Sequence, residues 1–284
     1  ILSQLIRTTF IPKKNHRFII ADFSAIEARI IAYLSDEKWR IDVFNTHGKI
    51  YEASASKMFK VDINEITKES ELRQKGKIAE LALGYQGGVK ALVSMGAYNM
   101  NLCESELIEI VRAFRSSNTN IVKLWNTVEK AFIEAVNNKS IVHIDKNISF
   151  IYEGNILFIK LPSGRRLSYI RPKIDYNNAF NKSIITYEGV DSTTKKNTRL
   201  TTYGGKLVEN IVQAIARDVL GEAMMNLRNK GFNIVMHVHD EIVLEVENGV
   251  SSVEKVCEIM CKENRYLKGL NLRADGFESN YYKK

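Results

Sequence analysis

Two apolar runs separated by a short polar break constrain the fold of this chain more than any other feature. The stretch Val235–Val246 reads VMHVHDEIVLEV, with apolar and β-branched residues on both sides of His239, Asp240 and Glu241. Two such runs favour an antiparallel β-hairpin, although the break lacks the glycine of the common two-residue turns. Negative charge on a half-buried sheet is costly unless cations or hydrogen bonds compensate it. We therefore expect a positive group beside these acids; an exposed, solvated loop tip is the alternative.

A second acid also follows a predicted strand. The run from Phe18 to Ala21 reads FIIA, which indicates a buried strand, and Asp22 comes directly after it. A helix-capping role is the alternative, because Ser24 and Glu27 match the Ser-x-x-Glu capping box. If the two strands are neighbours, the carboxylates of Asp22 and Asp240 converge. Carboxylate oxygens suit Mg²⁺, which substrate phosphates commonly complete, so phosphoryl transfer is the candidate chemistry.

A third stretch carries positive charge at helical spacing. In LRQKGKIAELALGY, residues 72–85, the side chains of Arg73, Lys77, Leu81 and Tyr85 recur every four positions. This spacing places them on one face of a predicted helix. Two cations followed by an apolar and an aromatic residue would meet a nucleotide in order, triphosphate first and base or sugar last. The alternative is an amphipathic helix with a solvated basic edge.

The remaining pattern predicts an α+β fold with partly segregated helices. Helices are predicted over 24–34, through most of 46–138, where Trp125, Val128, Phe132 and Val136 form an apolar stripe, and over 206–230, closed by Gly231. Strands are predicted over 148–151, 156–161, 167–170 and 184–187, and a loop over 191–198.

Composition narrows the class of protein. The chain has 284 residues, 45% of them hydrophobic, so it can bury a sizeable core, and its net charge of +8 favours a polyanionic partner. No apolar run reaches the ~20 residues that cross a bilayer, and no signal-peptide pattern is present. We expect a cytoplasmic protein with no membrane partner. The three cysteines lack metal-type spacing, and we expect them to be buried and reduced.

Three stretches, in this order, resemble the signature motifs of the family A DNA polymerases, the bacterial polymerase I type, with bacteriophage and prophage members the most similar. The stretch ADFSAIEARIIAYLS (21–35) resembles the first palm motif, RQKGKIAELALGYQGG (73–88) the fingers helix and VHDE (238–241) the second palm motif. Supporting stretches are IRTTFIPKKNHRFII, LPSGRRL and YGGKLVENIVQAIARD. The resemblance implies a palm with an antiparallel sheet over 1–45 and 141–284, and helical fingers inserted over 46–140.

The resemblance also implies an activity and a set of site residues. A template-directed DNA polymerase would add dNTPs to the 3′-hydroxyl of a primer by two-metal nucleotidyl transfer and release pyrophosphate. Two Mg²⁺ ions would be held by Asp22, Asp240 and the carbonyl of Phe23, and Glu241 would support the site near the primer end. The residues implied to contact the incoming nucleotide are Phe23, Glu27, His47, Arg73, Lys77, Leu81 and Tyr85. Those implied to contact template or primer DNA are Arg29, Gln213 and His239.

Two of these roles are more specific. Lys77 would also protonate the departing pyrophosphate, and Glu27 beside Tyr85 would exclude a 2′-hydroxyl and so select deoxynucleotides. The sequence departs from the family pattern at Leu81, where Phe or Tyr is usual, and at Ala25, where Gln is usual. The chain begins with Ile1 just before the first palm motif, so we expect a trimmed or processed chain without a thumb or exonuclease domain.

Three alternatives stay open. The first is that this chain is a fragment, which would become active only with a thumb-bearing polypeptide or a processivity factor as partner. A Mg²⁺-dependent nuclease would also use paired aspartates and basic surface, but a triphosphate clamp such as Arg73 and Lys77 is of no use to it. A single-subunit RNA polymerase would share the carboxylates, although Glu27 beside Tyr85 favours deoxynucleotides.

Overall fold

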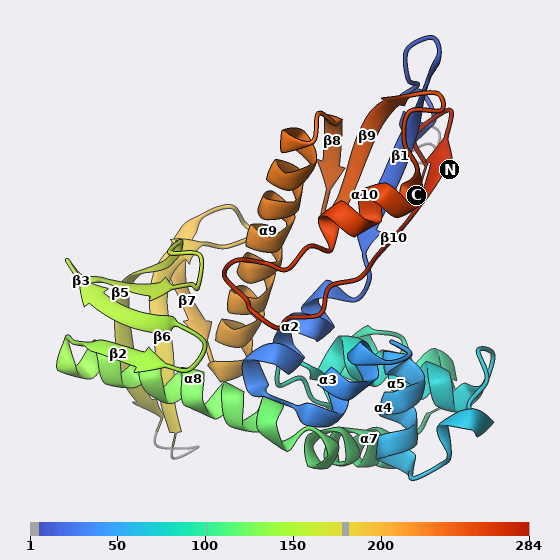
Figure 1. The fold of residues 1–284 in the computed structure, drawn as a ribbon. Helices are drawn as coiled ribbons and strands as arrows, with labels where there is room; N and C mark the ends of the chain where they lie inside the picture. The colour runs from blue at the N-terminus through green and yellow to red at the C-terminus, as the bar shows by residue number, and fades with distance from the viewer. Residues whose placement is uncertain (1–5, 101, 178–181, 284) are drawn as a thin grey trace. The chain divides into compact units, whose positions relative to one another are not determined.

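A computed structural model of the chain describes residues 6–100, 102–177 and 182–283. The chain forms two units: unit 1 combines residues 1–30 with 214–284, and unit 2 is the continuous segment 31–213. The predicted α+β class is confirmed, since each unit combines helices with an antiparallel sheet (Figure 1). The predicted segment 141–284 is divided between the two units at Gln213, and the names palm and fingers stay predictions.

The strand predicted over 18–21 lies inside the sheet of unit 1. The strand order is β10 (Ala274–Ser279), β1 (His16–Phe23), β9 (Glu241–Glu247) and β8 (Asn233–Val238), and every neighbouring pair is antiparallel. Ile19 and Ala21 of this central strand are fully buried. Helix α10 (Val253–Met260) packs on β10 and β1.

Both boundaries between the units fall inside helices. Helix α2 (Ile26–Ser35) contains the first boundary and α9 (Gly204–Asn229) the second. Helix α9 ends as predicted: Gly231 has φ +85°, and its backbone N–H donates to the carbonyl of Arg228 at 2.9 Å. A residue without Cβ adopts this left-handed conformation at little cost, which is why glycine closes the helix.

Unit 2 begins with the helical block that the sequence predicts. Its elements are α3 (Lys38–Asn45), α4 (Ile50–Phe59), the 3₁₀ turn η1 (Ile63–Glu65), α5 (Glu71–Leu83), α6 (Val89–Ser94), the 3₁₀ turn η2 (Ala97–Met100), α7 (Glu104–Ser117) and α8 (Thr119–Asn138). The apolar stripe of α8 is confirmed, with Trp125, Val128 and Phe132 buried and Val136 half-buried.

A glycine allows α4 and α5 to cross closely. A Cβ atom added at Gly76 would lie 2.3 Å from the backbone oxygen of Tyr51 and 3.0 Å from the Cβ of Ala55. Glycine inside a helix is destabilising by itself, by about 1 kcal/mol relative to alanine. Its presence within the basic stretch is therefore explained by the packing of α5 against α4.

The second half of unit 2 is a six-stranded antiparallel sheet in sequential order. Its strands are β2 (Ile141–Ile144), β3 (Ile148–Glu153), β4 (Ile156–Lys160), β5 (Arg166–Asn177), β6 (Lys182–Val190) and β7 (Asn197–Thr202). Helix α8 packs against β2, β3, β4 and β5 (Figure 1). The four predicted strands are confirmed, three with wider bounds and β4 one residue shorter than predicted, but β2, β7 and β10 were not predicted. Strand β7 also shortens the loop expected over 191–198, because Asn197 and Thr198 pair with β6.

Two further expectations concern cysteines and membranes. The cysteines are free, as predicted, but the expectation of burial is wrong: Cys103 is exposed, and Cys257 and Cys261 are half-buried. Burial raises the pKa of the Cys261 thiol to about 11. Over the part of the chain that the structure describes, no helix combines the length and the apolar character needed to cross a membrane.

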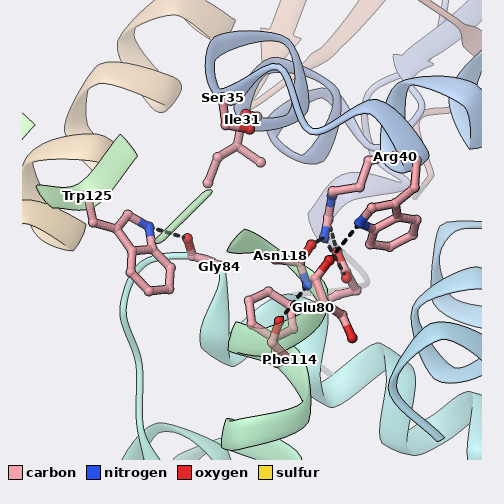
Figure 2. A network of polar contacts seen from close by, with 10 residues as sticks. Ile31, Ser35, Arg40, Glu80, Gly84, Phe114, Asn118 and Trp125 are labelled. Carbon is pink, nitrogen blue, oxygen red and sulfur yellow. Dashed lines mark hydrogen bonds and ion pairs between the residues drawn. The ribbon is translucent and has the colours of Figure 1, made fainter. Parts of the chain in front are cut away.

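A buried ion pair connects α3 with α5 in unit 2 (Figure 2). The guanidinium of Arg40, which is 2% exposed, donates to both carboxylate oxygens of Glu80, one at 3.0 Å, and to the amide oxygen of Asn118 at 2.8 Å. The amide nitrogen of Asn118 in turn donates to the carbonyl of Phe114 at 2.8 Å. These bonds compensate the charges that burial removes from water, so each partner depends on the others.

Removing one member of this pair should destabilise the protein strongly. We expect Arg40→Ala to lower the free energy of unfolding by about 3–5 kcal/mol, because Glu80 is left as an uncompensated buried charge. The double variant Arg40→Met with Glu80→Leu should cost less than Arg40→Met or Glu80→Leu alone, because no unpaired buried charge is left. Urea unfolding measures the single and double variants. The matched control is Arg166→Ala, which removes the exposed pair with Glu153 and should change stability by about 1 kcal/mol or less.

A buried tyrosine gives unit 2 a pH-dependent contribution to stability. The hydroxyl of Tyr169 accepts a hydrogen bond from Asn210 at 2.9 Å, and its ring meets those of Phe132 and Tyr187 edge to face at 5.3 and 5.0 Å. Burial raises the pKa of Tyr169 from 10.0 to about 12, and the Asn210 bond only partly opposes this. The folded state therefore holds the phenolic proton more tightly than the unfolded state does.

The sign of the effect follows from the raised pKa. The contribution of Tyr169 is fully present below about pH 10 and is lost as pH rises toward 12. We expect Tyr169→Phe to lose less stability than the wild type over this interval, whatever its stability at neutral pH. Urea unfolding midpoints at several pH values test this. Parallel alkaline slopes for the two proteins would contradict the expectation.

Candidate active site

The end of β1 and the beginning of β9 bring acids together in unit 1. In the antiparallel register Asp22 is directly opposite Glu241, and the backbone N–H of Phe23 approaches the carbonyl of Asp240 at 3.5 Å. The expectation that the two acid-bearing strands are neighbours is thus confirmed, although 217 residues separate Asp22 from Asp240 in the sequence. Asp22 and Asp240 are half-buried, and Glu241 is only 2% exposed.

The hairpin of β8 and β9 is closed by a two-residue turn without glycine. Val238 pairs with Glu241, so His239 and Asp240 form the turn between β8 and β9. His239 has φ +54°, a left-handed conformation that most residues with a side chain avoid. Strained backbone of this kind is concentrated at functional sites, where the surrounding structure holds it in place. Here the paired strands hold a turn that has Asp240 at its tip.

The turn after Asp22 is also held in a left-handed conformation. Ala25 has φ +52°, and α2 begins only at Ile26, so Ser24 precedes the helix and does not occupy the position of its N-cap. Arg29, which is 3% exposed, donates through Nε to the carbonyl of Ser24 at 2.8 Å and through Nη1 to that of Asn271 at 3.0 Å. Burial, reinforced by Arg273, lowers the pKa of Arg29. The expected contact of Arg29 with DNA stays a prediction.

Glu241 has a partner that the sequence motifs do not include. The hydroxyl of Tyr282 donates to Glu241 Oε1 at 2.8 Å, and both side chains are buried. Burial raises the pKa of Tyr282 to about 12, with further contributions from the bond to Glu241 and from its charge and that of Asp22. A tyrosine forty-one positions away carries no sequence signal for this role, so only the structure identifies it.

The donors that this site offers are carboxylate and carbonyl oxygens. In the described part of the chain, no three His, Cys, Asp or Glu side chains are grouped so that they could hold a metal. Mg²⁺ is usually bound through one or two carboxylates and completes its shell with waters and phosphates. Asp22, Asp240 and the carbonyl of Phe23 match that donor set.

The predicted basic face is present on α5 in unit 2. The side chain of Lys77 is exposed and that of Leu81 is 50% exposed. Arg73 lies on the same face and pairs with Glu52 of α4, with Nε 2.6 Å from the carboxylate, while its guanidinium lies 5.6 Å from the ring centre of Tyr51. A phosphate that binds Arg73 would therefore compete with Glu52, a neighbour that the sequence pattern does not reveal.

Tyr85 lies beyond the helix, so its predicted place on the helix face is wrong. Helix α5 ends at Leu83, and Tyr85 belongs to the turn that follows. The indole Nε1 of Trp125 donates to the carbonyl of Gly84 at 3.0 Å (Figure 2), which occupies an acceptor at the helix end. Gln86 then has φ +66°, which takes the chain out of the helical path.

The start of α9 packs against the same turn. The backbone N–H of Gly205 donates to Oε1 of Gln86 at 2.8 Å. A Cβ atom added at Gly205 would lie 2.4 Å from the backbone oxygen of Tyr85, and one at Gly204 would lie 2.3 Å from that of Trp125. In the stretch YGGKLVEN, Gly205 thus allows α9 to approach the turn that carries Tyr85, and Gly204 allows it to approach α8.

The other candidate residues occupy separate positions. His47 is exposed before α4, and its Nδ1 accepts a hydrogen bond from the backbone N–H of Lys49 at 3.0 Å. Glu27 is half-buried in the first turn of α2, and Gln213 and His239 are exposed. Within unit 1 the structure brings Asp22, Asp240 and Glu241 together, and within unit 2 it aligns Arg73, Lys77 and Leu81 on one helix.

Comparisons with known proteins assign the chain to a family. The model of "DNA polymerase family A" matches residues 2–276. A DNA polymerase of Bacillus phage SP02 is 57% identical over 284 residues, which is all of this chain and 44% of that protein. A DNA polymerase I of Borreliella burgdorferi is 27% identical over 278 residues, 95% of this chain and 25% of that protein. The chain thus spans less than half the length of these relatives.

A solved structure supports the same fold. The POL domain of Pol1 from M. smegmatis, in complex with DNA primer-template and dNTP, superposes with a TM-score of 0.65 at 21% identity, covering 98% of this chain and 42% of that one. Since the family model matches nearly the whole sequence and the phage relative is similar along all of it, this chain belongs to DNA polymerase family A.

Proposed function

We propose that this chain carries the nucleotidyl-transfer centre of a template-directed DNA polymerase, which adds dNTPs to a primer 3′-hydroxyl and releases pyrophosphate. The observation that carries the proposal is the β1–β9 register, in which Asp22 is opposite Glu241 and the backbone of Phe23 meets that of Asp240. Further support comes from membership of the family and from the similarity to the phage SP02 DNA polymerase.

The groups that would hold two Mg²⁺ ions are the carboxylates of Asp22 and Asp240 and the carbonyl of Phe23. When bound, the ions supply charge for the phosphates and activate the primer hydroxyl. Glu241, fixed by the hydroxyl of Tyr282, orients the neighbourhood of the primer terminus. Because positioning accounts for much of phosphoryl-transfer catalysis, the rigid sheet is the appropriate support for these groups.

The basic face of α5 would bind the triphosphate. The ammonium of Lys77 is exposed and can donate to phosphate oxygens, and it is the proposed proton donor to the leaving pyrophosphate. Arg73 joins it after exchanging the carboxylate of Glu52 for a phosphate. Leu81 offers an apolar surface to the base or sugar. The remaining proposed contacts are His47 with the triphosphate, Tyr85 and Glu27 with the sugar, and Arg29, Gln213 and His239 with DNA.

In this proposal residues 1–45 and 141–284 act as palm and residues 46–140 as fingers. The partners are primer-template DNA and dNTPs, and the place of action is the cytoplasm of a bacterial or phage-infected cell. A second candidate follows from one observation, the 44% of the SP02 polymerase that this chain covers. In that case, activity requires a thumb-bearing polypeptide or a processivity factor. Primer extension by the chain alone, compared with extension in the presence of the part of the SP02 polymerase that the chain does not cover, separates these two candidate functions.

The acids should be essential for chemistry and dispensable for folding. We expect Asp22→Ala and Asp240→Ala each to reduce Mg²⁺-dependent primer extension by roughly a hundredfold or more, because each loses charge stabilisation of several kcal/mol. Melting temperatures should stay near that of the wild type. Asp275→Asn is the matched control. Asp275 lies opposite Asp22 in the register of the neighbouring strand β10, but its side chain is exposed. Full extension by either alanine variant would refute the assignment.

The basic face of α5 should act on nucleotide binding. We expect Lys77→Ala to raise the KM for dNTP by about tenfold or more, because a charge-assisted hydrogen bond to phosphate is lost. The control is Lys75→Ala on the same helix, since Lys75 pairs with Glu71 at 3.0 Å. Steady-state extension at varied dNTP concentration gives both values. An equal change in KM for the two variants would show that the effect is one of general charge.

A further inference from the structure

Tyr282 lies in the segment after β10. The family model matches residues 2–276, so Tyr282 follows the last matched position. None of the palm or fingers motifs includes it. Its side-chain contacts lie within the sheet that carries the proposed catalytic acids, which makes it a candidate for a supporting role at that site.

Three kinds of contact fix the position of Tyr282. Its backbone N–H donates to the carbonyl of Phe10 at 2.9 Å, which anchors the segment after β10 to the segment before β1. Its ring packs in the buried cluster of Phe18, Ile20 and Val243, and only 3% of the residue is exposed. Its hydroxyl donates to Glu241 Oε1 at 2.8 Å. The ring therefore has little freedom to turn, and the hydroxyl is held at one point.

The acceptor of this hydrogen bond is the acid opposite Asp22. Glu241 is 2% exposed, and a carboxylate so deeply buried needs donors in place of the water it has lost. Tyrosine is a suitable donor, because its phenol is rigid and carries one proton. The pKa of Tyr282 is raised to about 12 by burial and by the carboxylates of Glu241 and Asp22, so the donor keeps its proton at neutral pH.

We propose that Tyr282 is a positioning residue: its hydroxyl holds the buried carboxylate of Glu241 in one orientation beside Asp22, so that the segment after β10 helps to set the geometry of the nucleotidyl-transfer centre. This inference rests on the proposed function. It differs from a purely structural role, in which the ring would fill the cluster and the hydroxyl would only satisfy a buried acceptor.

Removing the hydroxyl alone separates these roles. Tyr282→Phe keeps the ring and the backbone bond to Phe10, and we expect its kcat for primer extension to fall about tenfold with the KM for dNTP nearly unchanged. Two controls lose a tyrosine hydroxyl elsewhere. Tyr281→Phe removes the neighbouring hydroxyl from a side chain that is 41% exposed, and Tyr169→Phe removes a buried hydroxyl bonded to Asn210. Both should retain the kcat of the wild type.

A double-mutant cycle tests whether Tyr282 acts through Glu241. In a Glu241→Ala background, Tyr282→Phe should change kcat by less than about twofold, because the acceptor is already absent. The same four proteins, unfolded in urea, report the coupling between the two side chains without any need for activity. Strong coupling in stability together with an unchanged kcat for Tyr282→Phe would overturn the positioning role and leave the structural one.

The outcomes also separate this inference from the function on which it rests. A wild-type chain that extends no primer, even with the rest of the phage polymerase, overturns the proposed function and the inference with it. A wild-type chain that extends primers while Tyr282→Phe matches it overturns the inference alone. An equal loss of kcat from Tyr282→Phe in the presence and absence of the Glu241 carboxylate does the same, since the tyrosine would then act independently.

Discussion

The pairing of β1 with β9 is the interaction on which the rest of this structure depends. It joins two segments more than 200 residues apart, and closing so long a loop has an entropic cost that only an extended ladder and a buried sheet can offset. A shift of the register by one residue would turn Asp22 to the opposite face from Glu241. The geometry of the acids is therefore a property of the sheet, and the buried residues Ile19, Ala21 and Val243 are the ones that specify it.

Unit 2 supports its basic helix by a different means. The buried pair of Arg40 and Glu80, with Asn118 as third partner, and the close crossing with α4 at Gly76 both fix the position of α5. Buried ion pairs contribute little net stability, but they tolerate few alternative arrangements. Arg73 and Lys77 are therefore carried by a helix with a defined orientation, which suits the binding of a charged ligand.

Local pattern predicted much of this fold, and the failures have identifiable causes. The strand 18–21, the hairpin around His239 and the stripe of α8 were predictable, because each buries a regular apolar face. Strands β2, β7 and β10 lie at the edges of their sheets, where one side pairs with nothing in the described chain, and their sequences are short or polar. The helix ends before Tyr85 because Trp125 and Gly205 hold the turn, and no periodicity within α5 contains that information.

Residue types and their spacing in the linear chain predicted the proposed chemistry, through the acids Asp22, Asp240 and Glu241 and the cations of α5, and the order of motifs indicated the family. Those are matters of residue type and local spacing, which the linear chain carries. Tertiary structure alone decided that Asp22 is opposite Glu241, that Arg73 is paired with Glu52, that Arg29 is buried against backbone carbonyls and that Tyr282 holds Glu241. Each of these depends on strands or helices meeting across long stretches of sequence, and such contacts follow from packing and not from local propensity.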